Sequence, residues 1–230
     1  MKKSKSECDV NSCFMCRNCL KQWQPAIAAN KVNLKVKRGE VIFNEGDEVK
    51  GVYFVYDGVV KVHKKWGPDK ELIIRFASKG AIFGHRGLGG NNVYPISATA
   101  LEDGIVCYVD TEFFESTLKV NTEFTYNLMM FLVSELQESE KKMRNLAHMS
   151  VKGRVAQALV SLRDQFGKKE DGSINIELSR QDLASYAGAT YETVFRVLNE
   201  MLKENLIKTS GKKIIINNRE QLLQLTAQES

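Results

Sequence analysis

The chain has 230 residues, of which 43% are hydrophobic and 27% are charged. These values are ordinary for a globular protein, so they exclude a disordered chain, and the length favours one large or two modest domains. No run approaches the roughly 20 apolar residues of a membrane helix, and the polar N-terminus lacks the apolar core of a signal peptide. We therefore expect a cytoplasmic protein with no membrane segment. A net charge of +5 favours an anionic partner only weakly.

The N-terminal segment, residues 1–29, is rich in cysteine. Four of the five cysteines lie within it, at Cys8, Cys13, Cys16 and Cys19, and Cys107 stands far from them. In a reducing compartment such crowding favours metal ligation or redox chemistry over disulfides. The cysteines are therefore candidate ligands or redox groups.

The next region, residues 30–110, alternates short runs of aromatic and β-branched residues with glycine and proline. The runs lie at 51–56, 59–63, 72–76 and 105–109, and Asp57–Gly58 has the sequence of a hairpin turn. Many short strands at this spacing predict an antiparallel sandwich or barrel.

Residues 111–147 contain neither glycine nor proline, and apolar residues recur three and four apart, which predicts one long helix. Its length and heptad-like seam favour a dimer interface; the alternative is packing on its own domain. The interface candidates are Tyr126, Met129, Val133, Leu136, Glu140 and Met143. Glu140 would lie near its symmetry mate and weaken pairing, so dimerisation could be adjustable.

The last region, residues 148–230, begins with an amphipathic segment at 151–166. Ser179 and Asp182 make a capping-box start for a short helix, and Thr190 is a natural N-cap for the next one, which follows a turn at 187–189. Two short strands around Ser210–Gly211 complete a pattern typical of a winged helix-turn-helix.

On the second helix of this motif, the residues not needed for the core gather in the N-terminal half, which enters the DNA major groove in such motifs. Arg196 can donate two hydrogen bonds to guanine and Glu192 can accept one from cytosine; the alternative for this pair is a surface ion pair. The remaining base-side candidates are Tyr191, Thr193 and Phe195. Phosphate contacts are expected from Ser179, Arg180, Thr190, Thr193 and Lys212.

The segments 178–188 and 191–198 resemble the DNA-binding domain of the cyclic-AMP receptor/fumarate-nitrate reduction regulator (CRP/FNR) family. Segments 37–47 and 55–62 resemble its β-roll sensor domain, and the long helix resembles its dimerisation helix. The resemblance implies an α+β fold with a cyclic-nucleotide-binding-like jelly roll at 30–110, the dimerisation helix at 111–147 and a winged helix-turn-helix at 148–230. It also implies a homodimer that binds a two-fold-symmetric DNA site and recruits or hinders RNA polymerase.

The resemblance also bears on the signal. The cyclic-AMP branch carries Phe-Gly-Glu where this chain has Phe83-Gly84-His85, so cyclic AMP is not the expected ligand. The oxygen-sensing branch draws three iron-sulfur ligands from an N-terminal segment and a fourth from the strand before the dimer helix. It thereby implies a [4Fe-4S] cluster on Cys13, Cys16, Cys19 and Cys107 that oxygen or nitric oxide destroys. The cysteine spacing differs from that of relatives, so Cys8 is an alternative ligand.

Other interpretations stay open. Cys-x2-Cys pairs suit zinc equally, in which case the four N-terminal cysteines would bind zinc and Cys107 would be a core thiol. A zinc-containing or effector-free DNA-binding protein would follow, or a regulator that responds to a small nucleotide or to haem, with His85 as a haem ligand in principle. No nucleophile motif or acid-base pair is present, so an enzyme is not expected.

Overall fold

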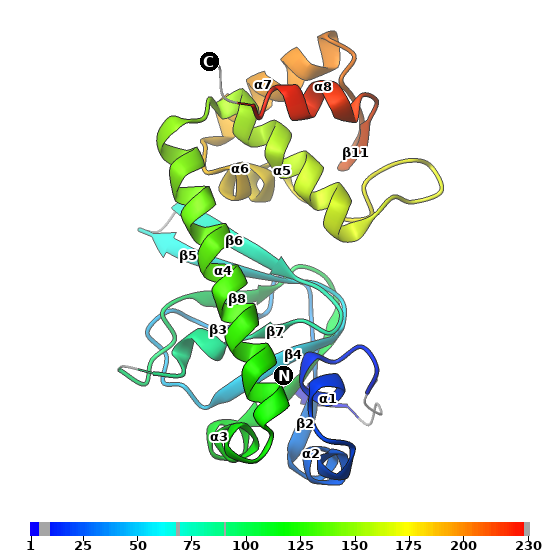
Figure 1. The fold of residues 1–230 in the computed structure, drawn as a ribbon. Helices are drawn as coiled ribbons and strands as arrows, with labels where there is room; N and C mark the ends of the chain where they lie inside the picture. The colour runs from blue at the N-terminus through cyan, green and yellow to red at the C-terminus, as the bar shows by residue number, and fades with distance from the viewer. Residues whose placement is uncertain (5–9, 68–69, 90, 228–230) are drawn as a thin grey trace. The chain divides into compact units, whose positions relative to one another are not determined.

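The computed structural model describes residues 1–4, 10–67, 70–89 and 91–227, so Cys8 lies outside the described residues. The chain divides into two compact units, residues 1–135 (unit 1) and residues 136–230 (unit 2), and the boundary falls inside a helix (Figure 1). Within the described residues, no helix has the length and apolar character needed to cross a membrane.

Unit 1 is built on two antiparallel sheets. The first contains, in spatial order, β1 (Lys2–Lys3), β2 (Lys31–Val36), β9 (Gly104–Asp110), β4 (Gly51–Asp57) and β7 (Ile82–Phe83). The second contains β3 (Val41–Phe43), β8 (Ser97–Ala100), β5 (Val60–Trp66) and β6 (Lys70–Ala77). Side chains from both sheets, including Phe83, Val106, Val60 and Ala98, share one apolar core. The antiparallel β-roll expected from the sequence is confirmed.

The predicted hairpin at Asp57–Gly58 is wrong. The strand before the turn, β4, pairs with β9 and β7, whereas the strand after it, β5, pairs with β6 and β8 in the other sheet. The turn therefore carries the chain between the sheets. Gly58 has a φ of +87° and lies against the backbone of Asp103 and Gly104, a left-handed conformation in a confined space that suits glycine.

The cysteine-rich segment is folded in its described part. It contains α1 (Phe14–Asn18), a 3-10 turn η1 (Lys21–Trp23) and α2 (Gln24–Asn30), which has a proline in its first turn. The segment is fixed to the β-roll where the Phe14 amide donates to the carbonyl of Gly80 at 2.9 Å. A Cβ at Gly80 would collide with the carbonyl oxygen of Ser12, so glycine is required for this close approach.

The single helix predicted over 111–147 is instead two helices, α3 (Thr111–Val120) and α4 (Thr122–His148), separated at Asn121. Asn121 has a non-helical backbone and is fully buried. Its side-chain oxygen accepts a hydrogen bond from the backbone of Leu20 at 2.9 Å, and its amide donates to the carbonyl of Thr117. A long-range polar contact therefore interrupts a helix that local sequence would continue.

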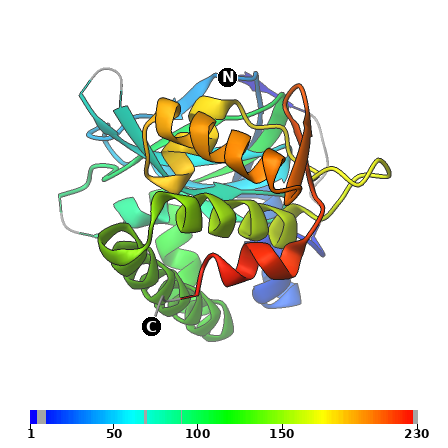
Figure 2. The same cartoon turned by 90° about the horizontal axis from the view of Figure 1, so that it is seen from above.

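Unit 2 contains α5 (Val151–Phe166), α6 (Arg180–Ala187), α7 (Tyr191–Lys203), β10 (Ile207–Ser210), β11 (Lys213–Ile216) and α8 (Arg219–Gln224). The predicted amphipathic segment and both predicted helices of the turn motif are present. The helix α5 packs against α6, α7 and α8, and in Figure 2 it lies between α7 and α8. The two wing strands pair antiparallel as expected, while α8 was not predicted.

Candidate nucleic-acid interface and cysteine site

Two capped helices form the motif that presents side chains to DNA. The hydroxyl of Ser179 accepts from the Asp182 amide at 2.9 Å and starts α6, and the hydroxyl of Thr190 accepts from the Thr193 amide at 3.3 Å and starts α7. Between them, Gly188 adopts a left-handed conformation at φ +65°. These local signals, all readable in the sequence, fix the angle at which α7 leaves the turn.

The face of α7 that points away from the core carries the predicted base-reading residues. Tyr191, Glu192, Phe195 and Arg196 are exposed, while Val194, Val197, Leu198 and Met201 are buried. Glu192 and Arg196 are both exposed, and the structure shows no ion pair between them within the described residues; their contact with bases stays a prediction. Both side chains are available for base edges.

Two aromatic residues extend this face. Tyr191 and Phe195 are 43% and 51% exposed, and their rings stack with centroids 6.3 Å apart and planes 14° from parallel. Exposed stacked rings present apolar surface, which in a major groove can contact the methyl group of thymine. Their contact with DNA stays a prediction.

The residues expected at phosphates differ in how much of their bonding capacity the fold already uses. The hydroxyls of Ser179, Thr190 and Thr193 already form hydrogen bonds at the helix caps. Ser179 donates to the Asp182 carboxylate, and the hydroxyls of Thr190 and Thr193 lie 3.0 Å apart. A hydroxyl that also bound a phosphate would have to keep or exchange these hydrogen bonds. Lys212 is exposed at the tip of the wing, whereas its neighbour Lys213 pairs with Asp171 at 2.6 Å.

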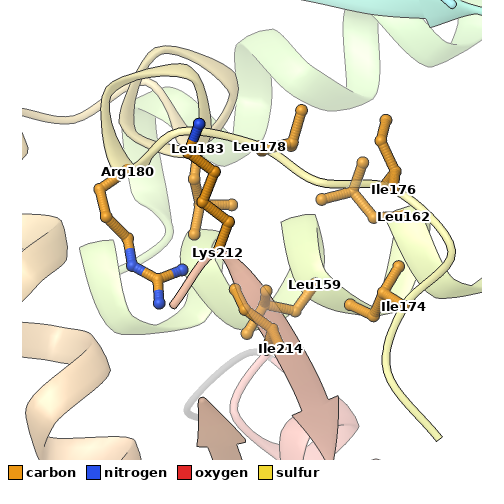
Figure 3. A pocket seen from close by; sticks show the side chains of 9 residues that line it. All are labelled: Leu159, Leu162, Ile174, Ile176, Leu178, Arg180, Leu183, Lys212 and Ile214. Carbon is orange, nitrogen blue, oxygen red and sulfur yellow. The ribbon is translucent and has the colours of Figure 1, made fainter. Parts of the chain in front are cut away.

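Arg180 has a role that its sequence position did not reveal. Its guanidinium donates to the carbonyl of Gly211 at 3.0 Å and so joins the start of α6 to the wing turn. Burial lowers the pKa of this guanidinium. Figure 3 shows Arg180 and Lys212 at one end of a small pocket whose other walls are aliphatic, formed by Leu159, Leu162, Ile174, Ile176, Leu178, Leu183 and Ile214.

Arg154 is a positioning residue that sequence reasoning missed. From α5 it donates to the carbonyls of Ala187 at 3.0 Å, Gly188 at 3.2 Å and Met149 at 2.8 Å. The first two acceptors belong to the end of α6 and the turn, so Arg154 neutralises the negative end of that helix. Nothing local in the sequence indicated this contact, because its partners lie 33 and 34 residues away.

The four described cysteines lie in one apolar core of unit 1. Their exposed fractions are 7% for Cys13, 3% for Cys16, 8% for Cys19 and 4% for Cys107, and they share the core with Phe54, Phe114, Phe124 and Leu128. None of the four forms a disulfide. The fold therefore brings Cys107, on β9, into the same core as the N-terminal thiols.

The electrostatics of this core disfavour thiolates. Burial, together with a smaller contribution from nearby Cys13, raises the pKa of the Cys19 thiol to about 12. The described residues contain no group of three histidine, cysteine or acidic side chains already arranged as metal ligands. The thiols thus share one core, but the described residues do not form a completed site.

The predicted dimer seam lies exposed along α4. Tyr126 is 56% exposed, Met129 is 51%, Val133 is 42%, and Leu136 and Met143 are each 60% exposed, with Glu140 exposed among them. An apolar stripe of this extent on a helix is typical of a surface that another helix covers.

An antiparallel β-roll, a long helix with an exposed apolar stripe and a winged helix-turn-helix with an open reading face together define a DNA-binding regulator rather than an enzyme. Comparison with known proteins agrees. Residues 33–121 match the model of the cyclic nucleotide-binding domain, and residues 153–225 match the model of the Crp-like helix-turn-helix domain. The chain belongs to the CRP/FNR family of transcription regulators, whose members bind DNA and are typically dimeric.

Individual relatives differ in the signal that their names state. The chain is 31% identical over 193 residues to the anaerobic regulatory protein of Bacillus subtilis, which covers 82% of this chain and 81% of the relative. It is 25% identical over 187 residues to a CRP-like cAMP-activated global transcriptional regulator of Mycobacterium tuberculosis, covering 80% and 84%. The solved structure of FixK2 from Bradyrhizobium japonicum matches with a TM-score of 0.77 at 25% identity, covering 87% of this chain and 99% of that one.

Proposed function

We propose that this chain is a homodimeric transcription regulator that senses oxygen, nitric oxide or redox state with a [4Fe-4S] cluster on Cys13, Cys16, Cys19 and Cys107. The observation that carries the proposal is the burial of these four cysteines, from two segments far apart in the sequence, in one core. Four cysteine thiolates are the usual ligands of such a cluster.

The donor chemistry of the core suits a cationic metal centre. Apolar surroundings keep the thiols protonated, and a metal that binds them must displace the protons and supply the compensating positive charge. The short helix α1 carries Cys16 and is bordered by Cys13 and Cys19, so small rotations within one turn would change the directions of three thiols together. A rearrangement of this kind is what binding requires, since the described residues hold no preformed ligand set.

The cysteine segment contacts the end of α3 and the start of α4. Leu20 donates to Asn121 at the α3–α4 junction, the Trp23 indole donates to the Thr117 hydroxyl at 3.1 Å, and Phe14 packs edge-on against Phe124 at 6.0 Å. Cys13, Cys16, Cys19 and Cys107 would hold the cluster, which would supply reactivity toward oxygen and nitric oxide. These four residues would then link the segment to β9, and the segment would support α4 less firmly once that link is lost.

The cysteine segment would affect DNA binding because α4, which it contacts, carries the predicted dimer interface. The exposed stripe of α4 would pair with the same stripe of a second copy, and each copy would offer Arg196 and Glu192 to one half of a two-fold-symmetric site. Only the dimer gains the combined free energy of both half-sites, so a weaker dimer binds DNA less tightly. On DNA in the cytoplasm, the dimer would recruit or hinder RNA polymerase.

Cyclic AMP is not the proposed signal. His85, which stands where the cyclic-AMP branch has glutamate, and the next residue, Arg86, both bind the carboxylate of Glu135. The Arg86 guanidinium, which could otherwise attract a cyclic phosphate, is therefore already paired with a carboxylate.

The test is anaerobic purification of the full chain, followed by iron, sulfide and zinc analysis and the visible spectrum. We expect a brown protein that bleaches in air and shifts toward monomer. Cys107→Ala should abolish both the colour and the response to air. Val109→Ala, on the same strand and in the same core, removes a buried side chain but no proposed ligand and should keep both. A colourless wild type that contains stoichiometric zinc, or no metal, contradicts the proposal.

A further inference from the structure

Two residues of α4, Phe131 and Glu135, lie four apart on one helical face and contact the β-roll. The Glu135 side chain is only 12% exposed, and one oxygen lies 2.7 Å from Nε of Arg75 on β6. Its other oxygen lies 3.0 Å from Nε2 of His85 and 3.2 Å from Nη2 of Arg86. His85 belongs to η2 (His85–Gly87), so a single carboxylate joins α4 to two separate elements.

The charge of Glu135 is stabilised by these neighbours. Burial alone would raise its pKa, but the hydrogen bond from His85 and the charges of Arg75 and Arg86 outweigh burial and lower the pKa to about 2. Burial lowers the pKa of His85, so the imidazole is neutral and donates one hydrogen bond. Such a network depends on a dry environment, because water screens the attraction between the charges.

Phe131 covers this network and contacts the cysteine segment. Its ring lies 5.4 Å from the His85 ring, edge-on, and 5.7 Å from the Arg75 guanidinium. On another side it lies 5.4 Å from the ring of Phe14, which lies between Cys13 and Cys16 in the sequence. Phe131 therefore touches both the proposed sensing segment and the ion-paired network.

We propose that Phe131 and Glu135 are the positioning residues through which the cysteine segment fixes α4 to the β-roll. Phe14 keeps Phe131 against His85 and Arg75, and Phe131 keeps water from the Glu135 network. When the segment leaves, Phe131 loses its partner, water reaches the carboxylate, and the first half of α4 becomes looser. This inference rests on the proposed function only for the event that releases the segment; the contacts themselves do not depend on a cluster.

The first experiment uses the full chain and hydrogen exchange of the α4 amides. Phe14→Ala and Phe131→Ala should each speed exchange over residues 126–135 by about tenfold, the size of a typical coupling. Phe43→Ala is the control, because Phe43 is a buried aromatic residue in the other core of unit 1, where it packs on Tyr53, Phe83 and Tyr94. Equal acceleration of α4 exchange in the control and in Phe131→Ala overturns the inference.

The second experiment measures coupling. In anaerobic protein, Phe131→Ala and Glu135→Gln should keep the iron content of the wild type but weaken the dimer about tenfold and show little further change in air. The milder Phe131→Leu should restore most of the response, and Glu138→Gln, at an exposed position of the same helix, should behave as wild type. Iron-loaded Phe131→Ala with a wild-type response to air overturns the inference. A wild type without iron contradicts the proposed function alone, and the exchange experiment still decides this proposal.

Discussion

The two units of the molecule prepare their functional side chains in opposite ways. In unit 2 the helix caps and Arg154 fix α7, and the reading residues stand exposed and without ion-pair partners among the described residues. In unit 1 the four cysteines are buried, burial raises the pKa of the Cys19 thiol, and no completed ligand set exists in the described part of the chain. The predicted DNA-reading side chains are already exposed, whereas the cysteines of unit 1 are buried and would have to rearrange to bind the proposed cluster.

This difference indicates which of the two units can respond to a signal. A preorganised surface loses little entropy on binding and gives a constant preference for sequence. A site that depends on a docked segment can exist in two states, and only such a site can transmit a change. The four predictions that follow test whether unit 2 is fixed and whether unit 1 is held by adjustable polar contacts.

Removal of Arg154 should have the largest effect. Arg154→Ala deletes three hydrogen bonds from a charged donor and leaves the carbonyls of Ala187 and Gly188 without that partner, so we expect unit 2 to lose about 4 kcal/mol of stability in urea unfolding. Arg163→Ala, on the same helix, should cost less than about 1 kcal/mol, because Arg163 makes no side-chain hydrogen bond among the described residues. Similar losses in both variants would show that the turn is not fixed by Arg154.

Acid should weaken unit 1 through Glu135. Its pKa is lowered from 4.5 to about 2 by His85, Arg75 and Arg86, so its contribution is complete above pH 4.5 and disappears as the pH falls toward 2. The shift corresponds to about 3 kcal/mol. The difference in stability between the wild type and Glu135→Gln should therefore narrow across this window, as measured by urea unfolding at successive pH values. A constant difference would mean that the network does not stabilise the ionised carboxylate.

Loss of Arg196 should remove sequence preference rather than general affinity. Arg196→Ala should cost about 2 kcal/mol per half-site on specific DNA and much less on random DNA. Lys203→Ala, at the far end of the same helix, should leave the ratio of the two affinities unchanged. The role assigned to Arg196 is wrong if its variant binds specific and random DNA in the same ratio as the wild type.

The smallest expected effect distinguishes the two wing lysines. Lys212→Ala should reduce the salt dependence of DNA binding by about one phosphate contact per subunit. Lys213→Ala should change it less, because Lys213 is already paired with Asp171. Equal changes in a titration of affinity against salt concentration would show that the wing approaches DNA with both lysines.

Local signals account for the parts of the structure that were predicted. The caps at Ser179 and Thr190, the glycine at the α6 end and the apolar spacing of α5 and α7 all act within a few residues, so the sequence shows them directly. The strand positions in unit 1 followed from the same kind of pattern. The exposure of the DNA-reading face followed once the buried positions of α7 were assigned.

The features that were missed depend on residues distant in the chain. The break at Asn121 requires Leu20, which is 101 residues away, and the failed hairpin at Asp57–Gly58 depends on which strands pair across the two sheets. Glu135 meets His85 and Arg86, which lie 50 and 49 residues earlier, and Arg75 on β6. The convergence of Cys107 with the N-terminal cysteines was expected from family resemblance and not from any local pattern.

On α7, the residues that pack in the core are different from those exposed to solvent, and this has an evolutionary consequence. Val194, Val197 and Met201 supply the packing of the helix, while the side chains that face outward contribute little to it. Substitutions at the outward positions can therefore change which operators are recognised at small cost to folding. A duplicated copy of this chain could acquire a new set of target genes by a few such exchanges, and a designed library at the same positions could retarget it.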